Sequence, residues 1–296
     1  MIDRELTRKQ EDWHRWFHER KCGHWQEGDR QCPIMKIQMG ITAETAPGLK
    51  YYPEAIWGDP RNPIWFMGIN PGQEKLGNPV SHVAAEREAC LNTQSCNQSY
   101  EESRRRHNLV ATHREVRDHY VFADSVTKAS LGLLTGRAKR VDAGDERVTD
   151  ATMSGLTIIN MAHCKCPDFN THFVSSHTYE ATKKTCAPFW DKCGERNLEA
   201  LVLWQPKLVV SYGEAPQWWM IHLVRNLGWA LDGVDTHHDA AKWWYMSAWL
   251  SQPEGTRVRV LFLKHPRGGL NMGKALEAFV KAKDDAGIGD LPRRRA

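Results

Sequence analysis

The stretch Pro63-Ile64-Trp65-Phe66-Met67-Gly68-Ile69-Asn70-Pro71-Gly72 decides the fold of this chain. Residues 63–70 form a short apolar run, and a proline and a glycine follow directly. A run of this length with a turn signal behind it is typical of a buried strand that ends in a tight loop. The stretch therefore predicts one strand of a buried sheet, with Asn70 at its carboxyl end.

Three more apolar runs resemble the first one in length, and they span Leu156 to His163, Leu208 to Tyr212 and Val258 to His265. Helical stretches at 178–204 and 214–228 lie between them. Strands that alternate with helices predict an α/β fold, in which helices cover both faces of a parallel sheet and the crossovers are right-handed. In such sheets the ligand lies beyond the carboxyl ends of the strands.

The rest of the chain surrounds this sheet, and we interpret residues 1–296 as a single domain. The flanking segments are a first amphipathic helix at 8–21, an irregular stretch from Cys22 to Pro60, a polar insertion at 73–118, a helix at 124–136, a charged loop at 137–154 and a last helix at about 271–286. The first helix and the stretch from Cys22 to Pro60 together form an N-terminal region at residues 1–60.

Polar residues or glycines stand at the carboxyl end of each expected strand, namely Asn70, Asn160 with His163, Gly213 and His265. An asparagine at such an end can hold a water or the polar edge of a base, and a histidine can donate to a developing anion. Each also has an ordinary interpretation. Asn70 would then belong to a plain turn, Asn160 would be a buried asparagine with satisfied hydrogen bonds, and His265 would lie on the surface.

The eight cysteines suggest a metal site more than a set of disulfides, because the cytosol keeps thiols reduced. Cys164, Cys166 and Cys186 fall in one crossover, and two thiolates from it plus two from the N-terminal loop would complete a four-thiolate site. The spacings do not fit a zinc ribbon, which has two short Cys-x-x-Cys pairs. Buried free cysteines are the alternative.

Charge and hydropathy indicate which partners the chain could bind, nucleic acid or a membrane. The net charge of +4 is small, but the runs Arg104–Arg106 and Arg293–Arg295 can neutralise phosphates, unless they merely form a solvated surface. No stretch reaches the roughly 18 apolar residues of a membrane helix, and the charged N-terminus lacks a signal core. We expect a soluble cytoplasmic monomer that makes no membrane contact.

Taken together, these segments resemble the uracil-DNA glycosylase superfamily from Cys22 to the last helix, with 73–118 unmatched. The segment at 68–72 is similar to the Gly-x-Asn-Pro-Gly motif of the mismatch-specific and single-strand-selective members, and His265-Pro266 is similar to the opening of the second motif. The resemblance implies a three-layer α/β/α sandwich with a central, mainly parallel four-stranded sheet. It also implies that Asn70 positions the attacking water and that His265 stabilises the departing base.

The cysteines resemble those of the iron–sulfur branch of this superfamily. Residues 160–167 are similar to its Asn-Val-Val-Lys-Cys-Arg-Pro-Pro segment, 186–190 to its Cys-x-Pro-Tyr-Leu, and 32–34 to the end of its Cys-x-x-Cys-Pro-Leu. The resemblance implies a structural [4Fe-4S] cluster on Cys22, Cys32, Cys164 and Cys186. The N-terminal pair is separated by nine residues instead of two, so Cys166 and Cys193 stay as alternative ligands.

The same resemblance implies a mechanism and a set of contacts for the other site residues. A pyrimidine is flipped out of DNA, stacks on Phe122 or Tyr120, pairs with Asn160 and leaves an abasic site. The base pocket is implied to comprise Gly68, Ile69, Gly72, Phe122, Tyr120 and Asn160. The DNA contacts are implied to be Arg267, Gly268 and Leu270, with Arg267 or Leu270 wedged into the duplex.

The identity of the base stays open. In the strictest uracil enzymes a tyrosine follows the first-motif proline and blocks C5, and here that residue is Gly72. Uracil, a 5-modified uracil, or a hydroxymethylated or glucosylated cytosine of phage DNA are the expected bases, in repair or in anti-phage defence. A non-catalytic iron–sulfur or zinc module that binds nucleic acid is the alternative. A metal-dependent nuclease ranks third, since no carboxylates cluster at the strand ends.

Overall fold

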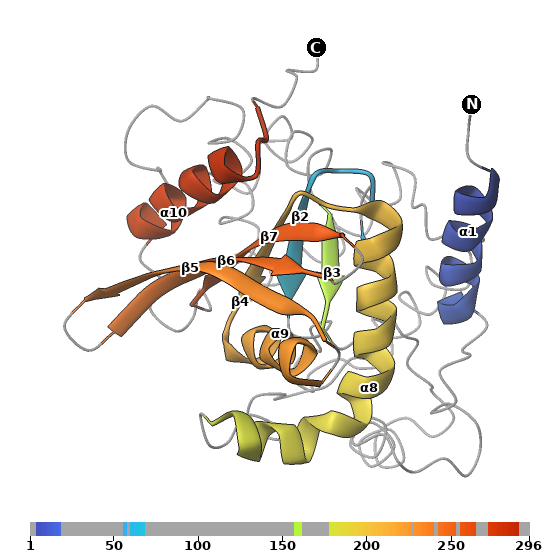
Figure 1. Cartoon of the computed structure of the whole chain (residues 1–296), viewed down its shortest axis with the longest axis horizontal. Coiled ribbons are helices and arrows are strands. Elements are labelled where there is room, and N and C mark those ends of the chain that lie inside the picture. The colour runs from blue at the N-terminus through green and yellow to red at the C-terminus, as the bar shows by residue number, and fades with distance from the viewer. Residues whose placement is uncertain are drawn as a thin grey trace, which may run out of the picture. The chain divides into compact units, whose positions relative to one another are not determined.

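The computed structural model describes residues 4–18, 56–57, 60–68, 157–161, 178–226, 228–239, 242–252, 255–264 and 272–289. Within these ranges the chain is an α/β protein, with a mixed, mostly parallel sheet flanked by helices (Figure 1). The helices of this part are α1 (Arg4–His18), α8 (Tyr179–Trp204), α9 (Glu214–Asn226) and α10 (Met272–Asp285). None of them is long and apolar enough to cross a membrane.

The sheet has the strand order β1-β3-β2-β4-β7-β6-β5. Its strands are β1 (Ile56–Trp57), β2 (Ile64–Gly68), β3 (Ile158–Asn160), β4 (Leu208–Tyr212), β5 (Ala230–Asp239), β6 (Lys242–Ser251) and β7 (Arg257–Leu263). The pairs β2–β4 and β4–β7 are parallel, whereas β7–β6 and β6–β5 are antiparallel. The backbone bonds Phe66 N to Thr157 O (2.7 Å) and Met161 N to Gly68 O (2.9 Å) also run in parallel sense along β2 and β3.

All four apolar runs of the sequence are strands in this sheet, as β2, β3, β4 and β7, and the three helices expected after residue 178 are α8, α9 and α10. The first helix is also present, but it begins at Arg4 and ends at His18 instead of spanning 8–21. The two-residue strand β1 interrupts the stretch that was expected to be irregular. The insertion at 73–118, the helix at 124–136 and the loop at 137–154 lie outside the described residues.

The expectation of a four-stranded sheet was wrong, because β1 and the antiparallel hairpin β5–β6 extend the parallel part. The sequence of β6 explains why this hairpin forms. The segment is rich in aromatic residues, which favour strands, namely Trp243, Trp244, Tyr245 and Trp249. β6 pairs with β7 along its length, for example Leu250 with Val258, so this edge of the parallel sheet is continued by the hairpin.

The core of the sheet follows from the alternation of side chains along each strand. One face of the strands packs on α10, whose apolar residues recur at helical spacing as Ala275, Ala278, Phe279 and Ala282. The strand residues in this cluster are Ile64, Phe66, Leu208, Val210, Tyr212, Leu261 and Leu263. The intervening residues are buried as well, among them Trp65, Met67, Val209 and Phe262, which is expected of strands covered on both faces. α9 contacts β4 (Figure 1).

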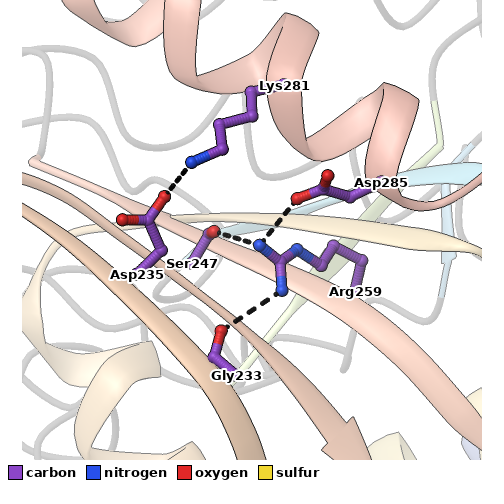
Figure 2. A network of polar contacts seen from close by, with 6 residues as sticks. All are labelled: Gly233, Asp235, Ser247, Arg259, Lys281 and Asp285. Carbon is purple, nitrogen blue, oxygen red and sulfur yellow. Dashed lines mark hydrogen bonds and ion pairs between the residues drawn. The ribbon is translucent and has the colours of Figure 1, made fainter.

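A buried arginine ties the hairpin to α10. Figure 2 shows Arg259 of β7 between three elements. Its Nη2 atom donates to Ser247 Oγ (2.7 Å) and to Asp285 Oδ2 (2.9 Å), and its Nη1 atom donates to Gly233 O (3.5 Å). An ion pair between Lys281 and Asp235 links the same helix to β5. The polar network therefore fixes the position of α10 on the antiparallel part of the sheet.

The chain divides into two compact units. The first contains α1, α8 and the end of β3, and the second contains most of β2, the strands β4 to β7, α9 and α10. In the first unit the Trp13 indole of α1 donates to Arg196 O on α8 (2.9 Å) and meets the Trp204 ring edge to face, with 5.1 Å between centroids. The single-domain organisation stays a prediction.

Candidate functional site

The parallel strands of the second unit end at the same level. Met67 of β2 is in register with Ser211 of β4, and Ser211 is in register with Phe262 of β7. Just beyond this level Gly213, at φ 80°, donates its N–H to Leu263 O (2.9 Å). Parallel strands that end level with one another expose their carboxyl ends at one edge, where ligands of α/β sheets bind.

In the first unit, Gly68 and Asn160 lie against each other at the ends of β2 and β3. A Cβ atom on Gly68 would be 2.5 Å from the Oδ1 atom of Asn160, closer than side chains approach. The backbone joins the same two segments, because Met161 N donates to Gly68 O (2.9 Å). Gly68 is therefore required for the Asn160 amide to lie where it does.

Asn160 closes β3 as a largely buried residue, only 7% exposed. Its backbone carbonyl accepts a hydrogen bond from the Nδ2 group of Asn197 (3.2 Å). A side-chain amide can both donate and accept hydrogen bonds, so this strand end could hold the polar edge of a ligand. A binding role for Asn160 stays a prediction.

Asn197 of α8 holds the end of β3, and sequence reasoning missed this residue. Its Nδ2 group donates to Asn160 O (3.2 Å) and to Met161 O (3.1 Å), and the residue is fully buried. The signal that could have revealed it is its spacing, since it lies seven residues after the buried Trp190 and four before the buried Leu201. An asparagine in the middle of an apolar helix stripe needs a polar partner.

Two of the cysteines lie in described residues, and both are on α8. Cys186 is fully buried and Cys193 is partly buried. Burial raises the pKa of the Cys186 thiol to about 12, and a contact with the Thr185 hydroxyl (3.8 Å) acts in the opposite direction. The thiol is therefore neutral at pH 7 unless a cation replaces its proton.

Of the four cysteines proposed to hold a cluster, Cys186 is the one that lies in the described residues. Cys186 fits that role in one respect, because a buried sulfur bound to iron is shielded from water. The other three proposed ligands, Cys22, Cys32 and Cys164, lie outside the described residues, as does Cys166. Within the described residues no group of three or more His, Cys, Asp or Glu side chains could hold a metal ion. The cluster thus stays a proposal.

Most of the residues that the sequence singled out cannot be compared with the structure. Gly68 and Asn160 are brought together, as just described. The expected catalytic, base-stacking and DNA-contacting residues all lie outside the described ranges, namely Ile69, Asn70, Gly72, Tyr120, Phe122, His163, His265, Arg267, Gly268 and Leu270.

Comparison with known proteins does not assign the chain to a family. No protein-family model matches the chain, and no curated protein matches it either.

Proposed function

We propose that this chain is a monofunctional DNA glycosylase that flips an abnormal pyrimidine out of DNA and hydrolyses its bond to the sugar. The observation that carries the proposal is the position of the Asn160 amide, which belongs to a largely buried residue and lies directly against Gly68 at the ends of β2 and β3. An amide has one acceptor and two donors on a single plane, which suits it to the polar edge of a pyrimidine.

The arrangement of the strands supports the proposed catalytic pair. Asn70 comes three residues after Met67, and His265 comes three residues after Phe262. These two strand positions are level with Ser211 on either side of β4. Neighbouring strands are about 4.8 Å apart, so strands on either side of a third are roughly 10 Å apart. In the proposal, Asn70 and His265 follow these two strands and act on the same sugar–base bond.

In the proposed reaction, each residue has one task. The extruded base stacks on Phe122 or Tyr120, and Asn160 bonds its polar edge. As the glycosidic bond breaks, His265 donates to the base oxygen that gains negative charge, an effect typically worth about 3–4 kcal/mol. Asn70 orients the water that attacks the sugar. Arg267 or Leu270 keeps the duplex open.

The proposed substrate is uracil or a 5-modified pyrimidine, because Gly72 stands where the strictest uracil enzymes have the tyrosine that blocks C5. A glucosylated or hydroxymethylated cytosine belongs to this class, and its removal would act against phage DNA. The proposed [4Fe-4S] cluster on Cys22, Cys32, Cys164 and Cys186 has a structural role, and no chemical step passes through it. The partner is DNA, and the protein acts as a monomer.

The test is an excision assay on oligonucleotides that each carry one modified pyrimidine. Alkali after incubation should cut the strand at the abasic site left by the enzyme. The variant Asn160→Ala should lower kcat/KM by roughly 10- to 100-fold, which corresponds to the 1–3 kcal/mol typical of a bidentate base contact. The variant Asn226→Ala is the matched control, because Asn226 is an exposed asparagine that bonds His222 on α9.

Three results would contradict the proposal. DNA binding without an abasic product for any base would favour a non-catalytic nucleic-acid-binding module. Strand cutting that depends on magnesium and needs no alkali would favour a nuclease. Equal activity of Asn160→Ala and Asn226→Ala would remove Asn160 from the base pocket.

A further inference from the structure

We infer that Asn197 is a positioning residue, which fixes the backbone that carries the Asn160 amide and so determines how well the enzyme discriminates between bases. The inference rests on the proposed function for its consequence, but its structural part stands on contacts alone. Asn197 is fully buried, and its Nδ2 group donates to the carbonyl oxygens of Asn160 (3.2 Å) and Met161 (3.1 Å).

The end of β3 needs such a support because the strand is short. β3 has three residues, and the bond from Met161 N to Gly68 O joins its end to β2. The carbonyls of Asn160 and Met161 both accept from the side chain of Asn197 on α8. One amide therefore binds two consecutive peptide groups, which restricts the backbone torsions of Met161 between them.

The side chain of Asn160 is confined from the other side by Gly68. The Oδ1 atom lies where a Cβ atom at position 68 would be 2.5 Å away, so the amide already occupies the space that a side chain would take. Gly68 is absent from the positive-φ residues, which means that its role is to leave space and not to allow an unusual backbone angle. Asn160 is thus held at its backbone by Asn197 and bounded at its amide by Gly68.

A fixed amide matters because uracil and cytosine differ mainly in the direction of their hydrogen bonds. At N3 uracil donates and cytosine accepts, and an amide that rotates by half a turn can satisfy either base. An enzyme gains selectivity only if the amide cannot rotate or move toward the wrong base. The backbone clamp by Asn197 restrains the movement of the amide without touching the substrate.

The experiment compares four variants of the full chain. Asn197→Ala and Asn197→Ser remove the donor completely or in part. Leu201→Ala is the destabilising control, because Leu201 is fully buried one turn further along α8 and donates no side-chain hydrogen bond. Gly68→Ala is the positive control, since its methyl group must displace the Asn160 amide.

Two readouts separate positioning from stability. The first is the pair of side-chain NH₂ signals of Asn160 in a ¹⁵N-labelled protein, which report its environment without any reaction. The second is the ratio of single-turnover excision rates for the preferred base and for the same base with its N3 edge changed from donor to acceptor. Unfolding midpoints are measured alongside, so that variants of equal stability are compared.

We expect the Asn160 signals to shift or broaden in Asn197→Ala and Gly68→Ala, less in Asn197→Ser, and not in Leu201→Ala. We expect the rate ratio to fall at least tenfold in Asn197→Ala. Unmoved Asn160 signals in Asn197→Ala, or equal changes in Leu201→Ala, would overturn the inference. A chain that excises no base would refute the proposed function, and the NMR comparison would still decide the role of Asn197.

Discussion

At the scale of single residues, we assign binding and positioning at the end of β3 to two different side chains, Asn160 and Asn197. In the proposal Asn160 offers its amide to the base, while its backbone carbonyl accepts a hydrogen bond from Asn197. Gly68 leaves space beside the amide. The position of the proposed binding group therefore depends on a residue 37 positions further along the chain, in a different element.

Tyr212 allows a prediction about alkaline pH. Burial raises the pKa of its phenol well above the ordinary value of 10.0, and its ring stacks on Phe66 with centroids 6.2 Å apart. The folded state thus favours the neutral phenol, and this contribution to stability is fully present below pH 10 and is lost as the pH rises above it. Between about pH 10 and pH 11 the loss approaches about 1.4 kcal/mol per pH unit.

The measurement is urea unfolding of the native chain and of Tyr212→Phe at about pH 9 and about pH 11. The native chain should lose more free energy of unfolding over this range than Tyr212→Phe, because phenylalanine cannot ionise. Tyr245→Phe serves as the control in the same core, since Tyr245 is only partly buried. Equal losses in the native chain and in Tyr212→Phe would contradict the assignment.

The sequence indicated Asn160 as a candidate but not Asn197, and the difference has a physical reason. A polar residue that closes an apolar strand is visible because strand ends are marked by turns and glycines. The partner of a buried asparagine on a long helix depends on which strand that helix meets. This is a tertiary property, and no local pattern encodes it.

At the scale of elements, the hairpin β5–β6 depends on Arg259 and α10. The Arg259 side chain is 5% exposed and its ion-pair partner Asp285 is 38% exposed. The Arg259 guanidinium also lies 5.4 Å from the ring centroid of Trp249, which Arg257 covers at 4.1 Å. A buried guanidinium costs desolvation energy, so it persists only where several partners offset that cost.

Arg259→Met should therefore lower the free energy of unfolding by about 2–4 kcal/mol, because it leaves Ser247 and Asp285 without their donor. The value lies toward the lower end because the partly exposed Asp285 can regain water. Urea unfolding with an unchanged m-value is the measurement.

The control for this prediction is Lys281→Met, which breaks the exposed ion pair with Asp235 on the same helix and the same hairpin. It should leave the unfolding midpoint nearly unchanged, since surface ion pairs contribute little. If both variants shifted the midpoint equally, the network in Figure 2 would act through surface charge and not through the buried arginine.

The sequence predicted the parallel strands but not the antiparallel hairpin, because the two kinds of strand differ in their sequence pattern. The runs that became β2, β3, β4 and β7 are short, apolar and bounded by turns, so their period and length identify them. Strand β5 carries polar residues and two breaks in its register, one between Asp232 and Asp235 and one between His237 and His238. Such bulges disturb the alternation on which a sequence-based assignment depends.

At the scale of the whole molecule, the fold class followed from the order of the elements, whereas the extent of the sheet did not. Alternating strands and helices predict a parallel sheet because crossovers are short and have one hand. The same rules do not specify how many antiparallel strands continue its edge. The same holds for the proposed function, because the residues proposed for it follow the strand ends, and local sequence patterns do not show whether such residues come together.

The final prediction concerns the composition of the whole protein. If the cysteines act as proposed, the purified chain should be brown, with iron and sulfide each near four per chain. Cys186→Ser should lose iron and colour, because Cys186 is the fully buried thiol of α8 and is one of the four proposed ligands. Cys193→Ser should keep both, since Cys193 lies two turns, or about 10.5 Å, further along the helix. If Cys186→Ser kept its iron and Cys193→Ser lost it, Cys193 and not Cys186 would be the ligand on α8. A colourless native chain that binds one zinc ion would refute the cluster, while the Asn160 amide and its role in base excision would still be tested by the excision assay.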